Sequence, residues 1–550
     1  MLKIILSLIF IFSQLAFAQN KITEIQKLAA TCKVWGFLKY YHPKVAGGEL
    51  NWDKQLFEVL PKIETAKTSE DFALVIENWI TSLGEIKKIE PIIEPKDTLY
   101  FDKNFDLSWI DKNKLFSKKL SKQLRFIERN RHQGLQHYVH VFQANQISIK
   151  NEDFSTYNYE FKNERILGMF MYWNLIEYFF PNKYLMDIKW EKTLGEMLPN
   201  FIQAKNENEF LTAFQKLTVR LNDSHVVFHR YDVIKKHHLP IITKIIDEKM
   251  IVTEILDSTI VKTDGIKTGD LIVKINDKEI KQIIEEKRSL ISASNESSFL
   301  NRITEPILTG TDDSIKIEFL IDGKNIIKNI NWVDLNENRY SLRNKPNYKK
   351  GAAKYKLLLN NIGYVNMGLL KEKNIPEMVE NLKTTKAIVF DLRNYPNGTL
   401  FEIANFINNK EEPFVIYTNP DLTYPGRYKW TQIDSCGKEN PENYKGKVII
   451  LLNEDAVSQP EWTAMGFQTA GNTTIIGSQT GGADGNVSNL QVFKQIYTQF
   501  TGLGVYYPDG RETQRIGIVP DIEVKPTIKG IQEGRDEVLE RALQFIETGK

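Results

Sequence analysis

Ser458 is the residue whose type and position best suit nucleophilic chemistry. An apolar run, Val448 to Leu452, ends in Asn453 and Glu454, and Ser458 then precedes an apolar-periodic segment over Trp462 to Ala470. This order predicts a buried strand, a turn and a helix, with the serine at the turn. The strand would lift the hydroxyl to the rim of a sheet, and the helix N-terminus would favour negative charge beside it. Serine is also a favoured helix N-cap, so capping is the alternative interpretation.

His225 is a second candidate for chemistry, since it follows an Asn-Asp-Ser turn in VRLNDSHVVFHR and precedes an apolar strand. An imidazole titrates near neutral pH, so it can remove a hydroxyl proton and return it to a leaving amine. A hydrogen-bonded turn histidine is the alternative. His229, His237 and His238 lie close by, so a histidine in this stretch is not by itself a signal.

Other chemistries lack their motifs. The sequence has no HExxH and no paired CxxC, and it has no phosphate-binding loop or dinucleotide fingerprint. We therefore expect neither a metal site nor a cofactor. Cys32 and Cys436 are the two cysteines, and either one disulfide or two free thiols fits them.

Composition and the first residues bear on location. The 72 Lys and Arg nearly balance the 70 Asp and Glu, which argues against a nucleic-acid or membrane-surface partner. Residues 1–18 have Lys3, an apolar core and a small-x-small end before Gln19, which predicts a signal peptide. We expect the mature chain to be soluble, without a membrane span, and periplasmic or secreted. An uncleaved anchor is the alternative.

The N-terminal half contains a repeat. Residues 34–61 align without gaps on residues 172–199, and two tryptophans and two prolines fall in one frame. This predicts two copies of a helical unit, in 19–90 and 162–232, the second carrying His225, with a mixed connecting region over 91–161. The aromatic residues at helical spacing predict core packing, and a ligand groove is the alternative.

The C-terminal half changes pattern twice. Residues 233–337 are short strands and turns, and the polar stretch 338–351 predicts a linker. Residues 352–550 alternate between strands and helices, which predicts a mostly parallel sheet covered by helices. The expected strands are 362–367, 387–391, 448–453 and 474–477, and the expected helices are 374–383, 399–408 and 461–470. The working edge should gather residues 393–398, 453–458 and 481–485.

Several of these segments resemble known families. The Gly-Asp turn and strand in DGIKTGDLIVKINDKEI (264–280) are similar to a PDZ domain, a module that binds a peptide as an added strand. The motifs NIGYVNM, VFDLRNYPNG, LLNEDAVSQPEW, IIGSQTGGADGNV and IGIVPDIEV, with NDSHVVF, resemble the S41 peptidases over residues 165–525. The resemblance implies a multidomain α+β protein with a ClpP/crotonase-like α/β core.

The resemblance also bears on the site residues. Tail-specific members of that family place a serine where this chain has Pro460 and a lysine base where it has Ala483, so a Ser-Lys dyad is absent. The pattern is closer to the tricorn-like and chlamydial branch, which implies Ser458 as nucleophile and His225 as base. A third member just before the Gly-Ile-Val-Pro-Asp motif would be Gln514 or Glu512.

The expected function is that of an exported serine endopeptidase acting on a polypeptide. The backbone N–H groups of Gly398 and Gln459 are the expected oxyanion donors. The oligomeric state is left open. An inactive binding protein on the same fold, carrying a lipid or peptide, and a PDZ scaffold are the alternatives.

Overall fold

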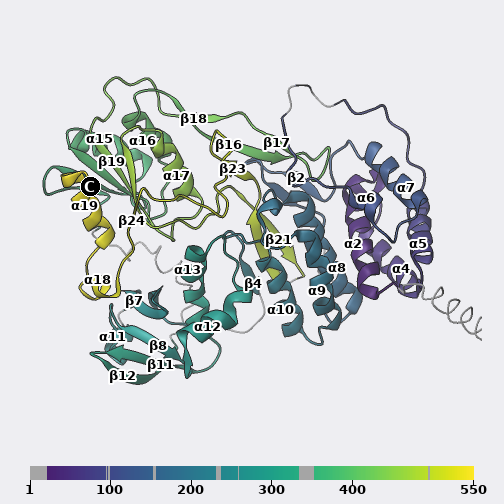
Figure 1. Ribbon diagram of the computed structural model, residues 1–550, viewed down its shortest axis with the longest axis horizontal. Helices are drawn as coiled ribbons and strands as arrows, with labels where there is room; N and C mark the ends of the chain where they lie inside the picture. The colour runs from purple at the N-terminus through teal and green to yellow at the C-terminus, as the bar shows by residue number, and fades with distance from the viewer. Residues whose placement is uncertain are drawn as a thin grey trace, which may run out of the picture. The chain divides into compact units, whose positions relative to one another are not determined.

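The computed structural model describes residues 22–93, 96, 99–152, 157–230, 237–257, 259–332, 352–493 and 496–550. The predicted signal peptide and the predicted linker lie outside these residues. The chain divides into two compact units, drawn in Figure 1. The first comprises the chain up to Arg220 with Thr418–Trp430 and Ser488–Thr498, and the second comprises Leu221–Tyr417, Thr431–Val487 and Gln499–Lys550.

The first unit is mainly helical. Its helices are α2 (Glu24–Tyr41), α3 (Pro43–Ala46), α4 (Trp52–Thr65), α5 (Ser69–Ser82), α6 (Trp109–Lys112), α7 (Lys118–Arg129), α8 (Lys162–Phe179), η1 (Lys183–Leu185), α9 (Trp190–Gln203) and α10 (Glu207–Val219). Its short strands are β1 (Tyr100–Phe101), β2 (Val139–Val141), β3 (Ile147–Ile149) and β17 (Tyr428–Trp430).

The aligned segments adopt the same local structure. In the first, the Trp35 and Trp52 rings stack with centroids 6.4 Å apart, and each indole N–H donates to the other residue's carbonyl. Trp173 and Trp190 repeat this arrangement with centroids 6.2 Å apart. All four rings are buried. The aromatic residues of the repeat therefore pack a core, as predicted.

The second unit contains an antiparallel sheet of strand order β12-β11-β8-β7-β6, with β9 paired to β8. The strands are β6 (Ile241–Ile246), β7 (Lys249–Ile255), β8 (Leu271–Ile275), β9 (Lys278–Glu279), β11 (Ser314–Ile321) and β12 (Lys324–Asn331). The helices beside them in the chain are α11 (Thr259–Asp264), α12 (Ile280–Lys287), η2 (Arg288–Leu290) and α13 (Glu296–Ile307). Isoleucines of the strands and of α12 and α13 form one buried cluster.

The second sheet of this unit has the order β13-β14-β15-β19-β20-β24, parallel from β14 onward. Its strands are β13 (Tyr355–Leu358), β14 (Ile362–Asn366), β15 (Ala387–Asp391), β19 (Lys447–Leu452), β20 (Thr473–Gly477) and β24 (Ile522–Glu523). The helices are η3 (Glu372–Asn374), α15 (Ile375–Leu382), α16 (Leu400–Ile407), α17 (Gln459–Gln468), α18 (Ile528–Gln532) and α19 (Glu537–Thr548). The predicted parallel sheet, its four strands and its three helices are confirmed to within two residues at each end.

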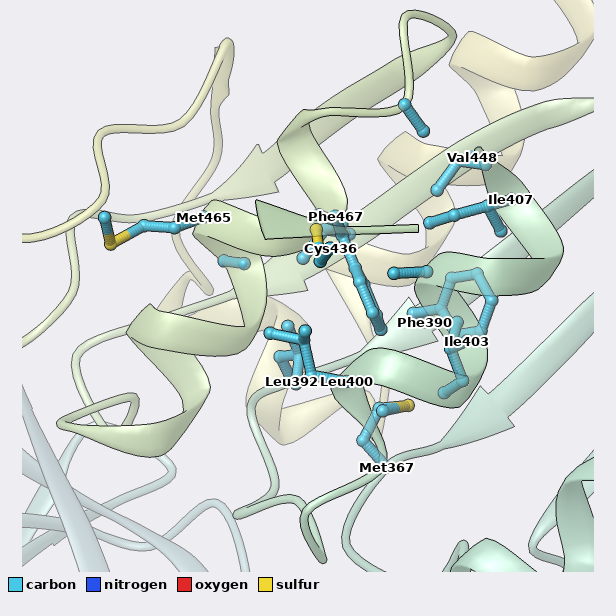
Figure 2. Close-up of a cluster of buried hydrophobic side chains, with 14 of the residues drawn as sticks. Met367, Phe390, Leu392, Leu400, Ile403, Ile407, Cys436, Val448, Met465 and Phe467 are labelled. Atoms are coloured by element: carbon cyan, nitrogen blue, oxygen red, sulfur yellow. The ribbon is translucent and has the colours of Figure 1, made fainter. Parts of the chain in front are cut away.

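Alternate residues of the parallel strands face two different cores. Phe390 and Val448 pack with α15, α16 and α17 in the cluster drawn in Figure 2, where Phe390 and Phe467 lie close together. Val389 and Ile449 join the opposite cluster, which includes residues of α19. Burial of both faces explains why these strands are continuously apolar in sequence.

The remaining strands are β4 (Phe228–Arg230), β5 (His237–His238), β10 (Thr309–Gly310), β16 (Glu412–Pro420), β18 (Asp434–Cys436), β21 (Val487–Val492), β22 (Ile496–Thr501) and β23 (Gly504–Tyr506). Cys32 and Cys436 are buried free thiols. Among the described residues, no helix has the length and apolar character needed to cross a bilayer.

Candidate active site

Ser458 lies at the joint between β19 and α17 in a backbone conformation that is rare for a side-chain-bearing residue. Its φ is +69° and its ψ is −121°. Such a conformation costs about 1–3 kcal/mol, persists only where the surroundings impose it, and is common at active sites. A serine on a strained strand-to-helix turn has its hydroxyl presented above the sheet edge, which is the geometry of a nucleophile elbow.

The turn is compatible with a helix start. Pro460 falls in the first helical turn, where a missing N–H is not needed. The N–H of Glu461 donates to the Ser458 carbonyl at 2.8 Å. Ser458 occupies the N-cap position, and its partial exposure leaves the side chain accessible.

Glu461 connects this turn to the glycine loop, residues 480–485. Its fully buried carboxylate accepts the N–H groups of Ser458 (3.0 Å), Gly482 (2.8 Å) and Ala483 (3.2 Å), and the hydroxyl of Thr480. Burial raises the pKa of Glu461 to about 7, against the opposing effect of these donors. The Glu461 carboxylate thus holds the strained Ser458 turn against the glycine loop.

The glycine loop contacts both predicted functional segments. The Ser458 N–H donates to the Ala483 carbonyl at 2.8 Å, and the Gly481 N–H donates to the Ala456 carbonyl at 2.9 Å. On the other side, the Ser224 hydroxyl donates to the Gly481 carbonyl at 2.7 Å. The loop therefore bridges the serine turn and the segment of His225.

Two glycines make this close packing feasible. A Cβ on Gly481 would lie 2.3 Å from the Val457 side chain, and a Cβ on Gly482, which holds φ +68°, would lie 2.9 Å from the Arg515 backbone. The lack of a Cβ at these positions lets the loop pack against the Val457 side chain and the Arg515 backbone.

His225 is buried, and its ring is held from one side. The ring Nδ1 lies 2.9 Å from Thr501 Oγ1, and the Thr501 hydroxyl donates to Asp223 Oδ1 at 3.0 Å. Because that hydroxyl has one proton and gives it to Asp223, it must accept the proton of His225 Nδ1. This tautomer leaves Nε2 with a lone pair, so Nε2 is the atom able to act as a base.

Asp223 is the acceptor at the centre of this network. Its Oδ1 also accepts the His225 backbone N–H at 2.9 Å and the Gln514 side-chain amide at 3.1 Å, and its Oδ2 accepts the Thr501 N–H at 2.8 Å. The carboxylate is completely buried. Its negative charge can stabilise an imidazolium through Thr501.

The surroundings of His225 favour its neutral form. Burial lowers the pKa of His225 below its ordinary value, and the nearby Arg302 charge lowers it further, while Asp223 acts in the opposite direction. A neutral imidazole at pH 7 is the form that a general base requires.

The structure differs from expectation at the third member of the site. The side chain against His225 Nδ1 is Thr501, whereas Gln514 is buried and reaches the network through Asp223. Glu512 lies in a β-bridge with Tyr506 and is partly exposed. Asp223 precedes His225 by two residues and was visible as part of the Asp-Ser-His motif. Thr501 had no sequence signal, since a threonine in a strand is ordinary.

The Gln459 side chain lies next to Gly398, the other residue expected to supply an oxyanion donor. Gly398 holds φ +70°, and a Cβ there would be 3.7 Å from the Gln459 side-chain nitrogen. The preceding Asn397 side chain donates to the Gly368 and Leu370 carbonyls, each at 3.0 Å, which fixes the loop after β15. Gln459 is the first residue of α17, where backbone N–H groups have no intrahelical acceptor.

The described residues contain no cluster of His, Cys, Asp and Glu side chains suited to a metal ion.

Comparison with known proteins identifies the region that holds the serine turn. Residues 361–524 match the model of peptidase family S41. A carboxy-terminal-processing protease of Bartonella bacilliformis is 26% identical over 203 residues, which are 35% of this chain and 45% of that protein. The chain thus matches less than half of the length of this relative.

Solved structures share the fold over a longer range. Mature CPAF complexed with lactacystin is 12% identical, with a TM-score of 0.55, and the match covers 70% of this chain and 99% of that one. Another structure of mature CPAF gives the same identity and TM-score and covers 98% of that chain. At this identity the likeness concerns the fold alone.

Proposed function

Because residues 361–524 are a region of peptidase family S41, we propose that this protein is an exported serine endopeptidase that hydrolyses polypeptides through Ser458 and His225. The observation that carries the proposal is the strained backbone of Ser458 at a strand-to-helix turn. Helix capping alone does not require that strain, because an ordinary N-cap residue has an extended backbone.

In the proposed reaction, Ser458 Oγ attacks the carbonyl carbon of a peptide bond. The hydroxyl proton moves to His225 Nε2, because the Nδ1 proton is engaged by Thr501. The N–H groups of Gly398 and Gln459 stabilise the oxyanion, each contributing about 10²–10³ in rate. Collapse of the intermediate breaks the C–N bond, and the imidazolium gives its proton to the leaving amine. Water, deprotonated by the same imidazole, then hydrolyses the ester.

We assign the support of the imidazole to Asp223 acting through Thr501. Gln514 keeps a role as a donor that orients the Asp223 carboxylate. This assignment accounts for an amide at position 514, because a buried carboxylate benefits from a donor and would be disfavoured by a second acid.

The antiparallel sheet of the second unit supports a further part of the proposal, a PDZ-like module. Strand β6 lies at the end of the sheet order, the position at which such a module adds an extended peptide. A groove of about 400 Å³ beside β6 and α13 includes Lys244, Leu300 and Asn301 among its lining residues.

The decisive experiment combines labelling and turnover. The wild-type protein should react with a fluorophosphonate probe at Ser458 and cleave an unstructured protein such as casein. Ser458→Ala should lose both, with a fall of at least about 10⁴-fold in turnover. Ser435→Ala, a partly exposed serine of β18 in the same unit, is the matched control and should keep both.

The competing functions give different results. A carrier on this fold would co-purify with lipid and would not be labelled, and a scaffold would bind peptides without cleaving them. Casein cleavage that survives in Ser458→Ala at the wild-type rate would remove Ser458 from the mechanism.

A further inference from the structure

Helix α13 is the element that touches each part of the candidate site. At its N-cap, the Asn295 side chain donates to the Thr480 carbonyl at 2.9 Å and to the Arg515 carbonyl at 3.3 Å. Further along the helix, the Asn301 side chain donates to the Asp455 carboxylate at 3.0 Å, in the turn before Ser458. The same helix therefore contacts the glycine loop and the serine turn.

Two residues of α13 contact the histidine segment: Ser298, whose hydroxyl lies 2.7 Å from that of Ser224, and Arg302. One terminal nitrogen of its guanidinium donates to the Ser224 carbonyl, and the other donates to the Val226 carbonyl. These are the carbonyl groups of the two residues that flank His225 in the chain. The flat, rigid fork of donors on an arginine suits such a two-point contact.

Other hydrogen bonds hold the same segment, but none of them joins the residues before and after His225. The Ser292 hydroxyl donates to the Asp223 carbonyl at 2.9 Å, and the Ser294 N–H donates to the Ser224 hydroxyl at 2.9 Å. The His225 carbonyl itself accepts the Gln499 side-chain amide at 2.9 Å. Of these groups, Arg302 alone brings a full positive charge.

We propose that Arg302 is a positioning residue of the peptidase site, which fixes the backbone on both sides of His225 so that the imidazole meets Ser458 in a reactive geometry. The inference rests on the proposed function, since it assigns His225 as the base. In this proposal Arg302 acts through His225 and does not touch the substrate.

The charge of Arg302 has a second effect on the same ring. The charged groups that act on His225 are Asp223, two residues before it, and Arg302 of α13, while Thr501 of β22 offers a neutral hydroxyl. Burial lowers the pKa of Arg302, while the charges of Asp223 and Glu305 act in the opposite direction. Its positive charge disfavours a second positive charge on the imidazole, so it helps to keep the base neutral.

Two variants separate position from charge. Arg302→Gln removes the charge and the two-point contact. Arg302→Lys keeps the charge, but a single ammonium cannot reproduce the fork to two carbonyls. Arg288→Gln is the matched control, because Arg288 is an arginine of the same antiparallel region that pairs with Glu296 on the surface.

The measurements are steady-state kinetics across pH and an NMR titration of the histidine side chains, with His225→Gln used to assign the His225 signal. For Arg302→Gln we expect kcat to fall about 10–100-fold with little change in KM, since small misplacements of a catalytic group have large effects on rate. The acid limb of the rate profile and the midpoint of the His225 titration should both move to higher pH.

For Arg302→Lys we expect a lower kcat, with the midpoint of the His225 titration near that of the wild type. If Arg302→Gln does not fold, Arg302→Lys still tests the proposal. Arg288→Gln should match the wild type in both measurements. An Arg302→Gln protein with wild-type kcat or with an unmoved His225 midpoint would overturn the proposal.

The failure of the proposed function would be seen separately. A wild-type protein that neither cleaves casein nor reacts with the fluorophosphonate would contradict the peptidase, whatever the variants do. The NMR titration would still report whether Arg302 acts on His225.

Discussion

At the scale of single residues, the candidate site depends on conformations and partners that residue type alone does not specify. Ser458 has a positive φ, and His225 has a defined tautomer because the Thr501 hydroxyl donates its hydrogen bond to Asp223. Each of these features has an energetic consequence that a substitution can measure.

The strain at Ser458 predicts a stabilising but inactivating substitution. Ser458→Gly should have a free energy of unfolding about 1 kcal/mol or more above that of Ser458→Ala, because glycine adopts this φ without steric cost. It should therefore unfold at a higher temperature. Both variants should lack peptidase activity. Thermal unfolding followed by circular dichroism gives the comparison, and a glycine variant less stable than the alanine variant would contradict the strain.

The environment of His225 predicts the acid limb of activity. Since burial and Arg302 lower the pKa of His225, the base stays neutral below its ordinary pKa of 6.5. The value of kcat/KM should therefore hold through pH 6.5 and fall only at lower pH. The folded-state pKa lies below the unfolded one, so the contribution of His225 to stability is present above the unfolded pKa and is lost as pH falls. A rate profile with its midpoint above 6.5 would contradict this account.

At the scale of elements, the sequence pattern was most informative where one period dominated. The apolar strands 387–391 and 448–452 and the following helices were predicted closely, because burial on both sheet faces leaves a continuous apolar run. The repeat at Trp35 and Trp173 likewise predicted equivalent helices. The role of α13 was not visible, because its contacts with the site run from polar side chains that a periodic pattern ignores.

The crossing of α2 and α8 gives a prediction at this scale. A Cβ on Gly36 would lie 1.8 Å from the Asn174 amide, which donates to the Cys32 carbonyl at 3.0 Å and to the Phe170 carbonyl at 2.8 Å. Gly36→Ala should thus destabilise the protein by about 1–3 kcal/mol through overpacking.

Gly195 of α9 provides the control for that variant. Nothing lies within 4 Å of a Cβ built there, so Gly195→Ala should stabilise the protein by up to about 1 kcal/mol through helix propensity. Urea unfolding of both variants measures the two effects. Equal changes in the free energy of unfolding for the two variants would show that close packing at Gly36 does not determine its effect.

At the scale of the whole molecule, export is proposed from residues 1–18, with Gln19 as the first residue of the mature chain. Expression with the native N-terminus in a bacterium that has a general secretion pathway should give a protein of reduced mass outside the cytoplasm. N-terminal sequencing should begin at Gln19. Retention of Met1 on a membrane-bound product would favour the uncleaved anchor instead.

The sequence alone determined the helical repeat and the parallel core, since these follow from local periodicity and from motifs that are contiguous in the chain. The pairing of Ser458 with His225 came from the resemblance to the S41 peptidases and stays a prediction. The tertiary structure decided which partner supports the imidazole. Thr501, Gln514 and Arg302 come from segments far apart in sequence, and they meet around Asp223 and His225 only when the sheet and α13 have packed. Hydrogen bonds act over about 3 Å in space and leave no trace in the spacing of residues along the chain.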